Sequence, residues 1–116
     1  VIPMAAEGWW LFGEQGLAAV DRPILMILGA VDELYTENVA IFDHIGTPDK
    51  ILLSFVDQDH RMIYKGYIKA LKAHFTAAFF GVHLQGREEM RDFLSEELFV
   101  NCSDVARGVY NEKIRL

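Results

Sequence analysis

The chain has 116 residues and a net charge of −6, and 52% of its residues are hydrophobic while 24% are charged. This composition fits one globular domain or a piece of one, and it excludes a disordered chain. The sequence lacks a basic cluster for nucleic acid, an apolar run of the ~18 residues that a membrane span requires, and a second cysteine to pair with Cys102. We therefore expect a soluble protein with neither a nucleic-acid partner nor a membrane span.

Glycines and aromatic residues are frequent in residues 1–13, which predict a loop leading into a short helical turn over residues 14–19. Asp21-Arg22-Pro23 ends this turn, because the residue before a proline avoids the helical conformation. Residues 24–28 (ILMIL) then form a continuous apolar run that stops at Gly29. A run of this kind is typical of a strand that is buried on both faces of a parallel sheet.

A second buried strand follows after one helix. Thr36 can cap a helix whose body is residues 38–42, and residues 46–49 (GTPD) stop it. Residues 51–56 (ILLSFV) form another continuous apolar run, which ends in the acidic turn of residues 57–59. Two such strands joined by a helix predict a βαβ unit with parallel strands and a right-handed crossover.

Helical patterns dominate the next part of the chain. From Tyr64 to Val82 the apolar residues step by three and four, which predicts an amphipathic helix of about five turns that packs on the sheet. Gly86 ends this region, and residues 87–98 predict a shorter helix with charged ends. Residues 100–116 are polar and weakly patterned, so they predict no further element.

Two side chains with catalytic chemistry follow the two predicted strands. Asp32 follows the first strand through the turn Gly29-Ala30-Val31, and His60 follows the second strand. Neighbouring parallel strands lie ~4.8 Å apart, so loops that leave the same edge of a sheet can touch. We therefore expect Asp32 and His60 to meet, with the acid orienting the imidazole and stabilising the imidazolium. Taken singly, Asp32 fits a helix cap equally well, and His60 fits a surface residue.

These segments resemble the C-terminal part of α/β-hydrolases. Residues 23–32 (PILMILGAVD) look like the penultimate core strand of that family and the turn that delivers the triad acid. Residues 51–56 with His60 look like the last strand and the triad histidine. Residues 12–20 (FGEQGLAAV) and 78–86 (AFFGVHLQG) resemble the dienelactone-hydrolase-like branch, which includes bacterial relatives of platelet-activating-factor acetylhydrolase.

One departure from the family is decisive for the interpretation. The family's nucleophile sits in a Gly-x-Ser-x-Gly elbow, and no such motif occurs in this sequence. Ser54 lies in a predicted strand and Ser95 in a predicted helix, while Ser103 and Cys102 lack the flanking glycines. We therefore expect an α/β fold in which residues 1–116 form a partial domain, the C-terminal fragment of an α/β-hydrolase. Its elements would be the last two parallel strands with a crossover helix, then a long helix and a shorter one.

The resemblance implies a serine or cysteine hydrolase that cleaves carboxylic esters, with Asp32 and His60 as catalytic residues and with no metal or organic cofactor. It also suggests that Trp9 and Trp10 line a substrate pocket, although ordinary packing explains them as well. The expected partners are a small ester and either the missing N-terminal portion of the enzyme or a second copy of the chain. Two strands alone would expose backbone edges, and the isolated chain would be inactive.

Two other interpretations compete with this one. A non-catalytic binding or assembly module would retain the same scaffold, and an in-frame Gly-x-Ser-x-Gly segment upstream would argue against it. A flavodoxin-like or receiver-like domain needs about five strands, and this sequence predicts fewer. Asp57 and Asp59 could bind a cation with His60, although acids in such turns more often solvate a loop; His74 and His83 lack the spacing of zinc ligands.

Overall fold

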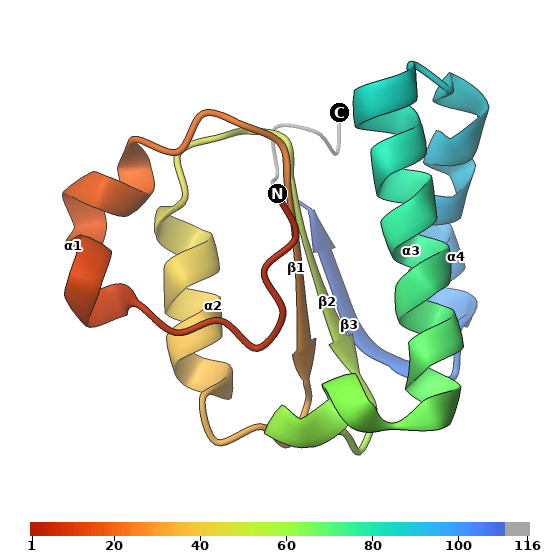
Figure 1. The fold of residues 1–116 in the computed structure, drawn as a ribbon, viewed down its shortest axis with the longest axis horizontal. Helices are drawn as coiled ribbons and strands as arrows, with labels where there is room; N and C mark the ends of the chain where they lie inside the picture. Colours follow the sequence, from red (N-terminus) through yellow and green to blue (C-terminus); the bar gives the residue numbers. More distant parts are fainter. Residues whose placement is uncertain (111–116) are drawn as a thin grey trace.

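The computed structural model describes residues 1–110, and Figure 1 shows how their helices and strands are arranged. A three-stranded sheet lies at the centre, in the order β1 (Ile24–Gly29), β2 (Lys50–Phe55) and β3 (Val105–Tyr110). β1 and β2 are parallel and pair along their full length, and β3 runs antiparallel to β2. The two predicted strands and the mixed α/β architecture are therefore confirmed.

Helices cover both faces of this sheet (Figure 1): α1 and α2 lie on one side, and α3, η2 and α4 lie on the other. The short helix η1 lies at the end of the sheet where β1 and β2 finish. The predicted crossover helix and the predicted long helix are present as α2 and α3. The bounds are Trp9–Ala18 for α1, Tyr35–His44 for α2, His60–Tyr64 for η1, Gly66–Gln85 for α3, Glu88–Leu94 for η2 and Glu96–Asn101 for α4.

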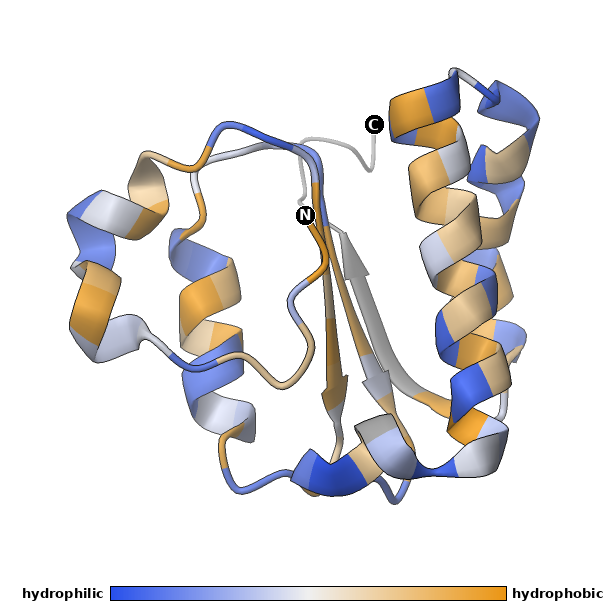
Figure 2. Cartoon of the chain, viewed as in Figure 1, coloured by the Kyte–Doolittle hydropathy of each residue, from blue (hydrophilic) through white to orange (hydrophobic). Residues whose placement is uncertain are grey.

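Every residue of β1 and β2 is buried, which explains their continuous apolar sequences. Successive side chains of a strand point to opposite faces, so the two strands serve two apolar clusters. Leu25 and Phe55 belong to the cluster that includes residues of α3 and α4, whereas Met26 and Leu52 belong to the cluster with α1 and α2. Figure 2 shows the apolar residues along β1 between the two helical layers.

The C-terminal quarter differs from its sequence-based prediction in two ways. Residues 100–116 were expected to lack an element, and this is wrong because Val105–Tyr110 form β3; residues 111–116 lie outside the described part of the chain. The single helix expected over residues 87–98 is also wrong, because the chain forms the separate short helices η2 and α4. Ser95 is extended between them, with ψ of 148°, and its hydroxyl accepts a hydrogen bond from Leu98 N at 3.2 Å, which begins α4.

The N-terminal helix also begins earlier than the sequence suggested. Residues 1–13 were expected to form a loop, but α1 begins at Trp9 and bends at Gly13, where φ is 59° and ψ is −177°. Glycine adopts a positive φ without steric strain, so the glycine marks a kink within the helix and not its start. In α2, the cap position belongs to Leu34 and not to Thr36.

Both edges of the parallel strand pair are occupied by other parts of the chain. β3 covers the edge of β2, and residues 1–5 run along the edge of β1. There Leu25 N donates to Val1 O at 3.0 Å, and Ala5 N donates to Ile27 O at 2.8 Å. The premise that β1 and β2 have bare edges is therefore wrong, while association with a missing portion or a second copy stays a prediction. Among the described residues, no helix has the length and hydrophobicity needed to cross a membrane.

Candidate acid–histidine site

The candidate site lies where β1 and β2 end. Because the two strands are parallel, the chain leaves both of them at the same edge of the sheet. We call residues 30–32 the acid loop and residues 56–60 the histidine loop. Val31 N of the acid loop donates a hydrogen bond to Gln58 O of the histidine loop at 2.9 Å. This bond holds the two loops against each other.

Gly29 permits the close approach of the two loops. A Cβ atom at this position would lie 2.2 Å from the carbonyl oxygen of Gln58 and 2.9 Å from that of Asp59. Carbon and oxygen atoms that are not bonded do not approach so closely, so any side chain here would push the histidine loop away. The glycine before the acid loop therefore provides space for the backbone of the other loop.

Asp32 and His60 meet across these loops. Asp32 Oδ2 lies 3.2 Å from His60 Nδ1, and Asp32 Oδ1 accepts a hydrogen bond from Leu34 N at 2.8 Å. The side chain of Asp32 is 0% exposed, whereas that of His60 is 45% exposed. The acid is thus enclosed and held at both oxygens, and the imidazole reaches the surface. The structure brings together the two side chains that the sequence placed at neighbouring strand ends.

This contact defines what the imidazole can do. A carboxylate oxygen accepts hydrogen bonds, so in a neutral ring the proton is on Nδ1, which donates to Asp32. The other nitrogen, Nε2, then carries a lone pair and can accept a proton. When Nε2 is protonated, the buried carboxylate stabilises the imidazolium. The arrangement can therefore act as a general base and then as a general acid.

A tight turn sets the position of His60 at the start of η1. Asp59 caps this short helix, because its Oδ1 accepts a hydrogen bond from Arg61 N at 2.9 Å and lies 3.4 Å from Lys65 Nζ. Desolvation raises the pKa of Asp59, but the hydrogen bond from Arg61 and the charge of Lys65 outweigh it and hold the pKa below its usual range. Asp59 is thus ionised under neutral conditions and anchors the turn behind His60.

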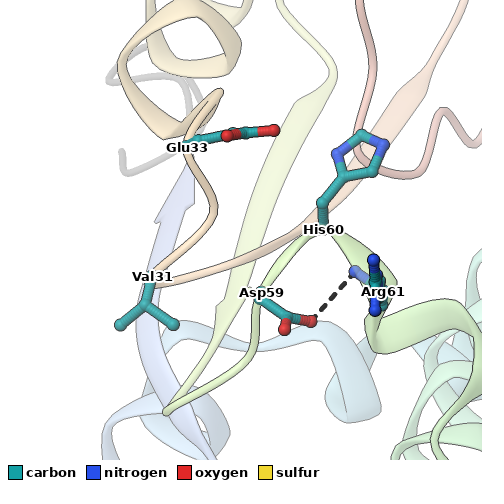
Figure 3. Close-up of a pocket in the computed structure, with 5 residues that line it drawn as sticks. All are labelled: Val31, Glu33, Asp59, His60 and Arg61. Atoms are coloured by element: carbon teal, nitrogen blue, oxygen red, sulfur yellow. Dashed lines mark hydrogen bonds between the residues drawn. The ribbon is translucent and has the colours of Figure 1, made fainter.

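A small pocket of about 230 Å³ adjoins the imidazole. Its lining residues come from both loops and their immediate neighbours: Val31, Glu33, Asp59, His60 and Arg61. Figure 3 shows the ring of His60 and the carboxylate of Glu33 on opposite sides of this pocket. A small molecule that contacts His60 from this side would meet one apolar side chain and several charged ones.

A nucleophile for this histidine is not found in the described part of the chain. Ser54 is buried within β2 and its Oγ has no hydrogen-bond partner, while Ser95 caps α4. Within residues 1–110, no hydroxyl or thiol group is hydrogen-bonded to His60. Within residues 1–110, the hydrogen-bonding partner of the His60 ring is therefore the carboxylate of Asp32.

Trp9 and Trp10 lie in α1, away from the pocket beside His60. Trp9 is half-buried, packs against the apolar cluster under α1 and α2, and makes an edge-to-face contact with His44 at a centroid distance of 4.7 Å. Trp10 is exposed. The two tryptophans and α2 line a separate hollow that shares no residue with the pocket of His60. Ordinary packing explains Trp9, and a role for the tryptophans in binding substrate stays a prediction.

The structure also places the acids that might have bound a cation. Among the described residues, no group of three or more histidine, cysteine, aspartate and glutamate side chains is arranged to hold a metal ion. Asp59 is engaged by Arg61 and Lys65. Asp57 has a φ of 53° and is exposed, so it serves the turn after β2.

Gln58 is the residue of this site that the sequence analysis missed. It is 2% exposed, and it contacts the acid loop through its carbonyl group. The sequence analysis treated it only as part of the acidic turn of residues 57–59, because a glutamine that is buried by the fold has no distinctive pattern in sequence.

Comparison with known proteins does not identify a family: no protein-family model matches this chain, and no match was found among curated proteins. The resemblance to α/β-hydrolases therefore rests on the residues quoted above. The contact between Asp32 and His60 is an observation that does not depend on this resemblance.

Proposed function

We propose that this chain provides the acid and the general base of a serine or cysteine hydrolase of carboxylic esters, of the α/β-hydrolase type. One observation carries the proposal: an enclosed Asp32 carboxylate lies 3.2 Å from Nδ1 of a half-exposed His60, beyond the carboxyl ends of two parallel strands. Catalytic groups of open α/β sheets occupy this place, and the acid precedes the histidine in the chain as it does in that fold.

In the proposed reaction, His60 Nε2 removes the proton from a serine hydroxyl or cysteine thiol as that group attacks the ester carbonyl. The tetrahedral intermediate collapses, the alcohol leaves with the proton from His60, and the acyl group stays on the nucleophile. His60 then takes a proton from water as the water attacks the acyl group. The second tetrahedral intermediate collapses, His60 returns this proton to the departing nucleophile, and the carboxylic acid is released. Asp32 orients the ring and stabilises the imidazolium throughout. These steps use no metal and no organic cofactor.

The nucleophile of this triad comes, in our proposal, from polypeptide outside residues 1–116. This follows from the lack of a Gly-x-Ser-x-Gly elbow in the sequence and of a hydroxyl or thiol partner for His60 in the described part of the chain. Residues 1–116 alone would accordingly show no turnover by this mechanism.

A second candidate function is a binding or assembly module without catalysis. The observation that favours it is the bond from Leu34 N to Asp32 Oδ1, which shows that the acid also fixes the start of α2. In that case the contact with His60 would only tie two loops. The half-exposed ring and its adjoining pocket favour catalysis over this alternative, because a purely structural tie requires neither.

The test is ester hydrolysis by the protein made from the complete coding sequence that contains these residues. We expect His60→Ala to lower kcat/KM for short p-nitrophenyl esters by about 10³-fold or more, because the base is lost. His74→Ala is the matched control, since His74 lies exposed on α3, and we expect it to retain activity. Equal activity of the two variants would reject the proposed function and favour the binding module.

A further inference from the structure

Gln58 connects the two loops of the site through its main chain. It lies two residues before His60, and its carbonyl oxygen accepts the hydrogen bond from Val31 N at 2.9 Å. The same carbonyl group faces Gly29, where a Cβ would lie 2.2 Å away. The main-chain carbonyl of Gln58 therefore contacts both the end of β1 and the acid loop.

The side chain of Gln58 fixes this peptide from the other direction. Its Nε2 donates to Val56 O at 3.0 Å, within the histidine loop, and to the hydroxyl of Tyr67 in the first turn of α3. Gln58 is 2% exposed, whereas Tyr67 is 59% exposed, so the bond between them joins a buried amide to a side chain at the surface. Gln58 thus contacts the acid loop through its main-chain carbonyl, and the histidine loop and helix α3 through its side-chain amide.

The histidine loop needs such anchors because its backbone is strained. Asp57 adopts a φ of 53°, a backbone conformation that residues other than glycine adopt less often. A strained turn persists only when its surroundings hold it. Asp59, directly before His60, accepts a hydrogen bond from Arg61 N, directly after it, at 2.9 Å. His60 therefore follows two anchored residues, Gln58 and Asp59, and is spanned by the bond from Arg61 to Asp59.

We infer that Gln58, supported by Tyr67, is a positioning residue that keeps Nδ1 of His60 facing Asp32. It touches neither the nucleophile nor the substrate in the proposed reaction, and it acts through the histidine loop. Loss of its side-chain bonds would let the loop move and the ring leave the acid, so that Nε2 would no longer be held as the acceptor. The effect on turnover rests on the proposed function, but the effect on the imidazole does not.

The experiment compares two tyrosines that lie three positions apart. Both side chains are more than half exposed, at 59% for Tyr67 and 82% for Tyr64. Tyr67→Phe removes the hydroxyl that accepts from Gln58, whereas Tyr64→Phe removes an exposed hydroxyl outside this contact. Nitrogen-15 NMR of the histidine rings in the folded chain reports which ring nitrogen carries the proton. We expect one tautomer of His60, protonated at Nδ1, in the wild type and in Tyr64→Phe, and a mixture in Tyr67→Phe.

In the complete protein, we expect Tyr67→Phe to lower kcat about tenfold with KM little changed, because misplaced catalytic groups slow the chemical step. Gln58→Leu should have a larger effect in the same direction; if that variant does not fold, the two tyrosine variants still decide the matter. Unchanged ring signals in folded Tyr67→Phe would overturn the positioning role.

The two proposals can fail separately. A changed tautomer in Tyr67→Phe together with an active His60→Ala variant would support the positioning role and reject the hydrolase. Loss of activity in His60→Ala, with unchanged ring signals and unchanged kcat in Tyr67→Phe and Gln58→Leu, would support the hydrolase and reject the positioning role.

Discussion

Asp32 makes two separate contacts in this site, and Gly29 leaves the space that one of them requires. Asp32 uses one oxygen to hold the start of α2 and the other to contact His60. An enclosed carboxylate is unfavourable unless both oxygens find donors, and here both do. Gly29, which has no side chain, sets the distance between the loops. The contact between acid and histidine thus depends on a residue that takes no part in it.

We expect Gly29→Ala to lower the free energy of unfolding by at least about 2 kcal/mol, because the new Cβ would collide with rigid backbone. Gly66→Ala is the matched control: no atom lies within 4 Å of a Cβ built there, and Gly66 begins α3. That variant should keep its stability or gain up to about 1 kcal/mol. Urea unfolding of both variants would measure the difference, and equal stabilities would refute the spacing role of Gly29.

At the scale of elements, side-chain contacts fix the ends of the helices relative to the strands. Lys50, the first residue of β2, is buried, and its Nζ donates to the carbonyl oxygens of Phe42 at 2.7 Å and Ile45 at 2.9 Å. These carbonyls belong to the C-terminal end of α2, where a cation is favourable. Burial lowers the pKa of Lys50, and the nearby Asp43 partly offsets that effect. One amine therefore joins the crossover helix to the strand that follows it.

Helix α3 is attached near its C-terminal end by a half-buried histidine. His83 Nδ1 lies 3.6 Å from Asp49 Oδ2, and the side chain of His83 is 13% exposed. Burial lowers the pKa of His83; Asp49 and Glu88 raise it, whereas Arg91 and the amino group of Val1 lower it further. The net direction is downward, so the folded chain binds this proton less tightly than the unfolded chain does.

This shift predicts how stability depends on pH. Below the ordinary histidine pKa of ~6.5 the unfolded chain gains the proton more readily, so the stability contributed by neutral His83 is lost as the pH falls through its lowered pKa. We expect urea unfolding to show that the wild type loses stability relative to His83→Gln as the pH falls from 7 to 5. A relative gain by the wild type would mean that the attraction of Asp49 outweighs burial.

β1, β2 and α3 could be predicted directly because burial sets the pattern of their sequences. β1 and β2 are enclosed on both faces, and α3 has one wide apolar face, so their sequences carry the signal directly. β3 (VARGVY) includes an arginine and a glycine, and it is a strand because it pairs with β2. The start of α1 was missed for a similar reason. Tertiary contacts hold the helix on both sides of Gly13, because Trp9 and Leu17 pack into the cluster that includes residues of α2.

For the molecule as a whole, the arrangement of the sheet creates the site. Parallel pairing brings two segments that are 28 residues apart, at Asp32 and His60, to one edge, and this part of the site follows from the sequence through a general rule of open sheets. The sequence does not contain the distance between two backbones, so the contact of Gly29 with Gln58 and the burial of Gln58 could be learned only from the fold. A nucleophile for His60 was found neither as a motif in the sequence nor among the residues that the structure describes.

The most direct test of the central claim is a double-mutant cycle on Asp32 and His60, measured as kcat/KM of ester hydrolysis in the protein from the complete coding sequence. We expect Asp32→Asn to lower kcat/KM by about 10³-fold and His60→Ala by at least as much, because the acid acts only through the histidine. The double variant should then be no slower than His60→Ala alone. Losses that multiply in the double variant, or an Asp32→Asn variant as active as the wild type, would contradict a functional acid–histidine pair.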